Sequence, residues 1–291
     1  MGAMPLRRVI VFNLIMLINQ NRMNWMKSFN CFLVIMTFLS VNHVFAQRTM
    51  FGSNNKYVVS SVAYQAPVIT TNGLVFNLDA AITSSYSGSG NVWNDIVGTN
   101  HINFYSSNSY ASAGNPTFST DGGGSLVTTG KFGRSVANSG ITGAAARSYE
   151  AWVKFNNVNA NSIISVGTNV TNQLFEMMAF QTNLISHPYG AYAKSSTVLT
   201  TNTWYQVVIT YNGASTHIIY INGVQVGTSS ASDGSNVTLN TVNTPIYIGS
   251  GTAMNWGAFD GKIAAVRMYN RALSSSDVTF NFNALKSRFG L

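Results

Sequence analysis

Short runs of alternating apolar and polar residues fill the chain from Asn72 almost to its end. These runs are rich in β-branched and aromatic residues and are separated by Gly, Asn, Ser and Asp, a pattern typical of a β-sandwich or barrel. In one of them Asn222-Gly223 stands between apolar residues, which predicts a two-residue type I′ hairpin turn. The predicted strands are Gly73–Asp79, Ser148–Phe155, Ser162–Gly167, Leu174–Gln181, Trp204–Tyr211, Thr216–Gly227 (the hairpin), Pro245–Gly249 and Gly261–Tyr269.

The pattern changes period once, near the C-terminus. Ser274 is a suitable N-cap, and Asp277 follows at the third helical position, where an acid favours the helix N-terminus. A stripe of apolar residues then recurs at helical spacing. We expect one helix that packs on the sandwich through Val278, Phe282, Leu285 and Phe289.

The N-terminal region has the layout of a secretory signal peptide. Lys27 provides the positive start, 29–39 is a short apolar run, and Val44-Phe45-Ala46 is a V-x-A cleavage motif before Gln47. A membrane span needs about 20 apolar residues, and this run is about half as long. We therefore predict a secreted protein with cleavage after Ala46 and no membrane span in the mature chain.

A second apolar run lies further upstream, and this gives a four-part division of the chain. We interpret residues 1–25 as an extension before the true start, 26–46 as the signal peptide, 47–71 as a leader arm and 72–291 as one domain. The alternative keeps both apolar runs as a two-part anchor.

Composition narrows the class of partner. Only 8% of the 291 residues are charged, against roughly 25% in ordinary soluble domains. Twelve basic and eight acidic residues follow Ala46, a net charge of +4, and the basic residues are scattered. Nucleic acid is therefore not an expected partner. The single cysteine, Cys31, lies in the signal region, so the mature chain has no disulfide and no thiolate metal site.

Three segments carry a family resemblance: "SYEAWVKF" at 148–155, "NTWYQVVITYNGASTHIIYINGVQVG" at 202–227 and "FDGKIAAVRMYNRALSSSDV" at 259–278. Their order and spacing resemble the laminin-G-like, concanavalin A-like lectin/glucanase superfamily. The opening segment at 73–100 and the ending "NFNALKSRFGL" at 281–291 resemble in particular the versions found in bacterial secreted and phage-associated proteins. The resemblance implies an all-β jelly-roll sandwich of two antiparallel sheets with a short C-terminal helix. It implies no single function, because the fold occurs in lectins, adhesion domains and glycosidases.

Catalysis on this fold would need two carboxylates about 5–9 Å apart. The chain has two glutamates, Glu150 and Glu176, and neither lies in the E-x-D-x-x-E-like pattern of the family's enzymes. Alternation places Glu150 on the strand face opposite Tyr149, which we interpret as a mixed, partly wet face. His101, His187 and His217 lack metal or triad spacing. We predict that the protein is not an enzyme; an inter-strand pair of these glutamates is the alternative.

Calcium is the one cofactor that the resemblance implies, since relatives hold Ca²⁺ at the sandwich rim through aspartate and carbonyl oxygens. Asp95 and Asp260 stand at the corresponding positions. Val97 replaces the usual serine after Asp95, and Ala264 and Ala265 replace acids after Asp260. A turn-capping role is the alternative for both aspartates.

Aromatic residues in loops are the candidates for glycan contact, because sugar faces stack on exposed rings. Trp256 with Asn255 is the first, Trp93 with Asn91 and Asn94 the second, and Tyr189 the third. The alternative for Trp93 and Trp256 is a ring folded over the core.

The sequence leaves three functions. The first is a secreted, non-catalytic module that binds carbohydrate or a cell-surface polymer. The second is a structural or adhesion component that contacts protein, of the cell-surface or phage-fibre type. The third is a glycoside hydrolase.

Overall fold

The computed structural model describes residues 68–250 and 258–291 of the chain. The predicted extension 1–25, the signal peptide 26–46 and most of the arm 47–71 lie outside the described residues. The last residues of that arm contact the far end of the chain. Thr70 N donates a hydrogen bond to Asn281 Oδ1 at 2.8 Å, and Ile69 packs against the apolar cluster that includes Leu285 and Phe289.

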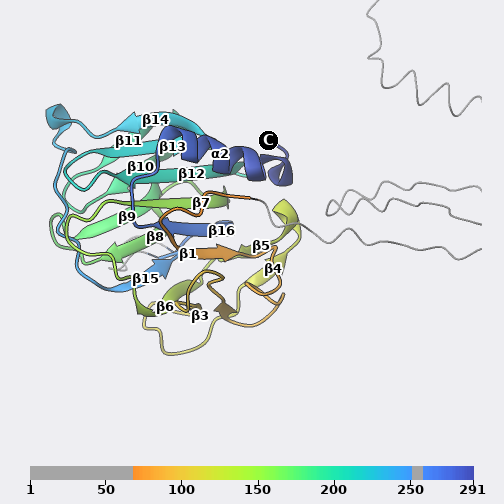
Figure 1. The fold of residues 1–291 in the computed structure, drawn as a ribbon. Helices are drawn as coiled ribbons and strands as arrows, with labels where there is room; N and C mark the ends of the chain where they lie inside the picture. The colour runs from red at the N-terminus through yellow and green to blue at the C-terminus, as the bar shows by residue number, and fades with distance from the viewer. Residues whose placement is uncertain (1–67, 251–257) are drawn as a thin grey trace, which may run out of the picture. The chain divides into compact units, whose positions relative to one another are not determined.

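Two antiparallel sheets form the sandwich (Figure 1). We name them sheet A and sheet B. Sheet A has the order β14-β13-β12-β7-β16-β5-β4, with β1 also paired to β16. Its strands are β1 (Leu74–Asp79), β4 (Thr117–Ser119), β5 (Ser125–Val127), β7 (Arg147–Phe155), β12 (Trp204–Tyr211), β13 (His217–Ile221), β14 (Val224–Thr228) and β16 (Gly261–Tyr269).

Sheet B has the order β11-β10-β9-β8-β15-β6-β3-β2. Its strands are β2 (Val92–Trp93), β3 (Ile102–Tyr105), β6 (Phe132–Asn138), β8 (Asn161–Gly167), β9 (Leu174–Phe180), β10 (Asn183–His187), β11 (Ala193–Val198) and β15 (Pro245–Ile248).

Every strand expected from the sequence is present, within one or two residues at its ends. The hairpin turn is also confirmed, because Asn222 and Gly223 have φ of +51° and +80°, as a type I′ turn requires. The sequence pattern missed the two- and three-residue strands β2, β4 and β5, and strands in which small or polar residues interrupt the alternation, such as β6 and β11.

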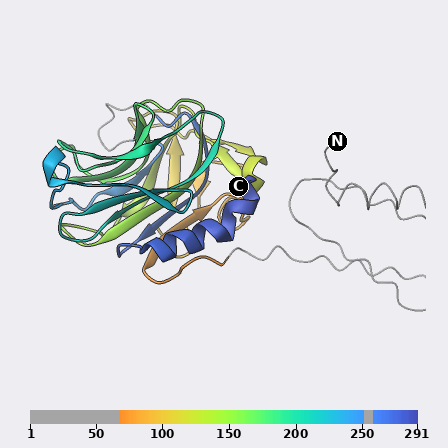
Figure 2. The ribbon, with the colours of Figure 1, turned by 90° about the horizontal axis from the view of Figure 1, so that it is seen from above.

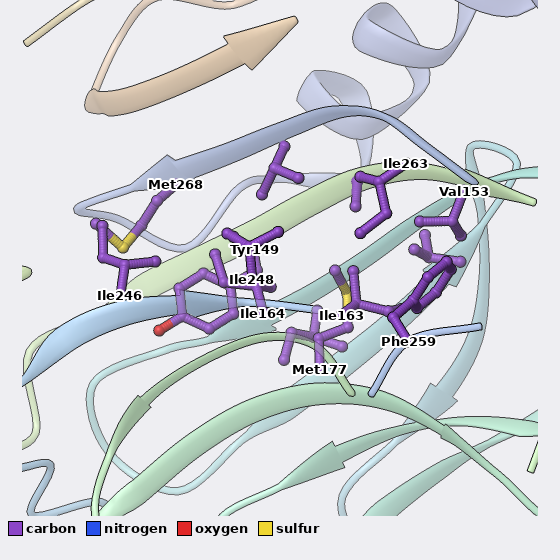
Figure 3. Packing of buried hydrophobic residues seen from close by; sticks show 14 of the residues in the cluster. Tyr149, Val153, Ile163, Ile164, Met177, Ile246, Ile248, Phe259, Ile263 and Met268 are labelled. Carbon is purple, nitrogen blue, oxygen red and sulfur yellow. The ribbon is translucent and has the colours of Figure 1, made fainter. Parts of the chain in front are cut away.

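The core lies between the two sheets and follows from alternation along each strand. Tyr149 and Val153 of β7 and Ile263 of β16 point inward from sheet A, and Ile164 and Met177 point inward from sheet B (Figure 3). All five are at most 1% exposed. Burial of such side chains contributes roughly 1.5–3 kcal/mol each.

Helix α2 (Ser275–Leu285) covers the outer face of sheet A (Figure 2). The predicted cap is present: Asp277 N donates to Ser274 Oγ, and Ser274 N donates to Asp277 Oδ2. A short 3₁₀ turn, η3 (Lys286–Phe289), follows. Trp152 stacks on Phe289, with ring centroids 4.1 Å apart. Trp152 and Trp204 therefore lie between sheet A and the C-terminal helical segment.

The expectation that Glu150 lies on a partly wet face is wrong. Glu150 is 0% exposed, because α2 covers the outward positions of β7. Asn281 Nδ2 of the helix donates to Glu150 Oε2 at 2.7 Å, Gln206 Nε2 donates to Oε1 at 3.0 Å, and Arg267 Nη1 lies 3.2 Å from Oε1. Its ionic partner is thus on the neighbouring strand, β16, and it fixes the helix to the sheet.

Arg267 also lies 3.6 Å from Asp79, which in turn pairs with Arg288 of η3 at 2.7 Å. Two carboxylates and two guanidinium groups therefore form a neutral buried network beneath the C-terminal segment. Among the described residues, no helix is long and apolar enough to span a membrane.

Candidate functional site

Six side chains form one line across the outer face of sheet B, at positions that face each other in the strand register. Ser165 of β8 stands opposite both Tyr247 of β15 and Glu176 of β9. Glu176 faces His187, Tyr247 faces Arg134, and Arg134 faces Asn103. We call this set the polar row: Asn103, Arg134, Tyr247, Ser165, Glu176 and His187.

Strand alternation explains why the polar row faces outward. In β9, Phe175, Met177 and Ala179 belong to the core between the sheets, so Glu176 points to the other side. In β15, Ile246 and Ile248 belong to the core, so Tyr247 also points outward. No helix of the described residues packs on this face, in contrast to sheet A (Figure 2). With strands about 4.8 Å apart, the row extends over roughly 24 Å.

Glu176 and His187 form one end of the polar row. His187 Nδ1 lies 3.0 Å from Glu176 Oε2, and Glu176 is 0% exposed. The second carboxylate oxygen, Oε1, is buried and has no hydrogen-bond partner. Tyr189 is partly exposed, and its ring centroid lies 6.0 Å from that of His187. The third predicted glycan contact, Tyr189, therefore borders the row.

Tyrosine rings and a guanidinium group form the other end. Tyr110 contacts Tyr105 and Tyr247, with ring centroids 5.2 and 5.9 Å apart, and all three rings are partly exposed. The Arg134 guanidinium carbon lies 5.4 Å from the centroid of Tyr110. The rings offer apolar faces beside a cation, a combination suited to sugar rings.

The two glutamates do not form a catalytic pair. Glu150 points outward from sheet A beneath α2, and Glu176 points outward from sheet B. Packed sheets are about 10 Å apart, and here both carboxylates point away from the space between them. Their separation exceeds the roughly 5–9 Å that a glycosidase mechanism requires.

Asp95 caps a turn and borders a cavity. Its Oδ1 accepts hydrogen bonds from Val97 N and Asn77 N, both at 3.0 Å. Its Oδ2 is buried without a partner, and the side chain lines a cavity of about 250 Å³. A Cβ at Gly98 would lie 2.8 Å from Oδ2, so a larger residue there would require the Asp95 side chain to shift.

Asp260 is held in a different environment. Its Oδ1 accepts hydrogen bonds from Thr129 Oγ1 at 2.8 Å and Asn156 Nδ2 at 3.0 Å. It shares none of these partners with Asp95. Calcium takes six to eight oxygen ligands, and among the described residues no three His, Cys, Asp or Glu side chains gather. Asp95 thus caps a turn, whereas Asp260 joins two side chains from other segments, and a role of either in calcium binding stays a prediction.

Trp93 lies in the core and not on a binding surface. It is 0% exposed and stacks on Phe104, with centroids 6.3 Å apart. The buried position of Trp93 does not support the prediction that its ring contacts a glycan. It agrees with the alternative, a ring that packs over the core. Trp256 and Asn255 lie outside the described residues, and their contact with a ligand stays a prediction.

The polar row has no signal in the sequence alone. Alternation in β9 and β15 indicated which residues share a face, but the pairing of β15 with β6 and β8 decides which residues become neighbours. That pairing joins segments far apart in the chain and has no local signal.

Comparison with known proteins agrees with this architecture. No curated protein matches the sequence. Domain 4 of AbnA, a GH43 extracellular arabinanase from Geobacillus stearothermophilus solved in complex with arabinotriose, is 17% identical. It covers 73% of this chain and 98% of its own, with a TM-score of 0.55.

Two botulinum neurotoxin structures show the same likeness. A type C toxin, described as entering cells through two ganglioside molecules, is 14% identical with a TM-score of 0.52. The binding domain of toxin DC, in complex with rat synaptotagmin II, is 17% identical with a TM-score of 0.51. Each covers 73% of this chain, whereas the match spans about half of the toxin chains (51% and 52%).

At such identities these structures show a shared fold only. A sequence-family model provides the stronger result, because it matches residues 121–279, more than half of the chain. This match includes all three segments on which the resemblance was based. The chain belongs to the concanavalin A-like lectin/glucanase superfamily, in its laminin-G-like branch.

Proposed function

We propose that the protein is an exported, non-catalytic module that binds a glycan along the polar row on the outer face of sheet B. The observation that carries the proposal is the partly exposed part of the row, formed by the Asn103 amide, the Arg134 guanidinium and the Tyr247 phenol on three adjacent strands beside the rings of Tyr105 and Tyr110. Ser165, Glu176 and His187 are at most 8% exposed and are not offered as direct contacts. Sugars are bound by ring stacking together with hydrogen bonds to their hydroxyl groups. The row and its adjoining tyrosines offer both.

Proteins of the same fold provide support of a coarser kind. The arabinanase domain binds arabinotriose, and the type C toxin is described as interacting with gangliosides. The fold thus occurs in carbohydrate-binding domains, and a binding function fits this chain. Export rests on the signal-peptide pattern of 26–46, and the lack of catalysis rests on the separation of the glutamates.

A glycan array tests the proposal. The full chain is screened with calcium and again with EDTA, beside the variants Tyr247→Ala and Trp256→Ala. Phe280→Ala is the matched control, since Phe280 is a 50% exposed aromatic residue on α2, against the opposite sheet. We expect binding that Tyr247→Ala weakens and Phe280→Ala leaves unchanged.

Other results have distinct meanings. Loss of binding in EDTA would show that a divalent cation takes part, for which Asp95 and Asp260 are the predicted ligands, and loss in Trp256→Ala would extend the site to that residue. A blank array under both conditions would contradict the proposal and favour the protein-contacting, structural role.

A further inference from the structure

Arg134 is an uncompensated cation on the face where we place the glycan. None of the ion pairs among the described residues involves it, although Lys154, Lys262, Arg267, Arg271 and Arg288 all have carboxylate partners. Its Nε is buried without a hydrogen-bond partner. A buried polar atom without a partner is unfavourable unless a ligand or water supplies one.

The surroundings fix the direction in which Arg134 can act. Its guanidinium lies over the ring of Tyr110, which in turn contacts Tyr105 and Tyr247. A guanidinium that stacks through its face keeps its N–H edge for in-plane hydrogen bonds. That edge matches the two oxygens of a carboxylate. The tyrosine rings beside it can stack on the sugar that bears the carboxylate.

The negative end of the row does not oppose such a ligand. Glu176 lies three strands from Arg134 in the order β9-β8-β15-β6, or roughly 14 Å. Since the Coulomb energy falls with distance, repulsion from Glu176 at this distance is weaker than the attraction of a carboxylate in direct contact with the guanidinium. An acidic sugar at Arg134 and neutral sugars toward Glu176 are therefore compatible with the same chain.

We propose that the polar row binds a carboxylated glycan, such as a uronate-containing polysaccharide, with the carboxylate paired to the Arg134 guanidinium. This inference rests on the glycan-binding function proposed above and adds the substrate class. It also gives the bound chain a direction, with its acidic sugar at the β6 end of the row.

The test compares polysaccharides that differ only in charge. Polygalacturonate, alginate and hyaluronate are each titrated into the full chain by calorimetry, beside the same polymers after chemical reduction of their carboxyl groups to alcohols. Arg134→Gln removes the cation. Lys194→Gln is the control, because Lys194 is an exposed cation on β11, on the same face of sheet B. Circular dichroism and a thermal melt establish that the variants fold.

We expect at least one acidic polymer to bind more tightly than its reduced form, and Arg134→Gln to weaken that binding roughly 10- to 100-fold. Lys194→Gln should change it less than about threefold. Equal binding of acidic and reduced polymers would overturn the carboxylate proposal and leave glycan binding intact. Acidic binding that both variants weaken equally would also overturn it, as unspecific attraction. No binding of any polymer, charged or reduced, would contradict both proposals.

Discussion

Replacement of Glu150 by glutamine should destabilise the fold, although Glu150 has no part in the proposed binding site. The side chain is 0% exposed and accepts hydrogen bonds from Gln206 Nε2, Arg267 Nη1 and Asn281 Nδ2. A glutamine there has one acceptor oxygen and an NH₂ group. That NH₂ group would face a donor, and the positive charge of Arg267 would lose its nearest counter-ion.

The expected loss follows from the burial of the network. Removal of one partner of a buried ion pair costs about 3–5 kcal/mol, because the other charge stays buried without compensation. Asp79, 3.6 Å from Arg267, remains and compensates part of the charge, so we expect the lower end, about 3 kcal/mol. For a domain of 150–250 residues this corresponds to a fall in Tm of about 6–12 °C.

Urea unfolding of the full chain, followed by tryptophan fluorescence, measures the loss. Trp152 and Trp204 lie beneath the helix that Glu150 anchors, so their emission reports its release. Lys154→Gln is the matched control on the same strand face. Lys154 pairs with Asp121 at 3.1 Å, but the two side chains are 23% and 31% exposed. Such a pair contributes about 0–1 kcal/mol.

A Glu150→Gln loss no larger than that of Lys154→Gln would refute the reasoning. It would mean that water reaches the network, or that the helix is held by apolar contacts of Trp152, Phe282 and Phe289 alone. A changed m-value would indicate that the helix detaches before the sandwich unfolds.

Three further predictions concern stability at low pH, the space beside Gly98 and cleavage of the signal peptide. Burial lowers the pKa of His217 to about 4. Between pH 6.5 and pH 4 the unfolded chain therefore binds a proton at this histidine that the folded chain does not bind. The free energy of unfolding should fall by roughly 3 kcal/mol over this range. Unfolding curves of His217→Gln over this range should lack that part of the slope, and an unchanged slope would contradict the assignment. Gly98→Ala should lower the free energy of unfolding by about 1–3 kcal/mol, because the new Cβ would contact Asp95 Oδ2. A double-mutant cycle with Asp95→Ser should show coupling between the two positions, and additive losses of stability would contradict the contact. Mass spectrometry of the exported protein should find Gln47 as the first residue, whereas an intact Met1 or Met26 would contradict the signal peptide.

The fold was largely predictable because its signal is local. Alternation in β7, β12 and β16 reports one buried face per strand, and Asn222-Gly223 has the backbone that a type I′ turn needs. The helix was also predictable, since Ser274 and Asp277 form the capping box within four residues. Strands such as β11, with sequence AKSSTV, carry too few apolar residues to be recognised without their neighbours.

The burial of Glu150 depended on information from the far end of the chain. Its outward neighbour on β7, Trp152, is an apolar residue on the same face, and the stripe on α2 requires an apolar surface to cover. Taken together, these two observations indicate that the helix lies on that face. Neither alone distinguishes a buried glutamate from a solvated one, because the carboxylate's partner Asn281 is polar and carries no burial signal.

The two outer faces of the sandwich therefore differ in a way that strand sequences can report. Outward positions of sheet A include Trp152, Trp204 and Ala264, and they are covered by the chain's own C-terminal helix. The polar row of sheet B instead contains a cation without a counter-ion and a carboxylate oxygen without a donor. Apolar outward residues find their partner within the chain. Arg134 is partly exposed and has no carboxylate partner among the described residues, which is better explained by a partner outside the chain, and this asymmetry is the physical basis for assigning binding to sheet B.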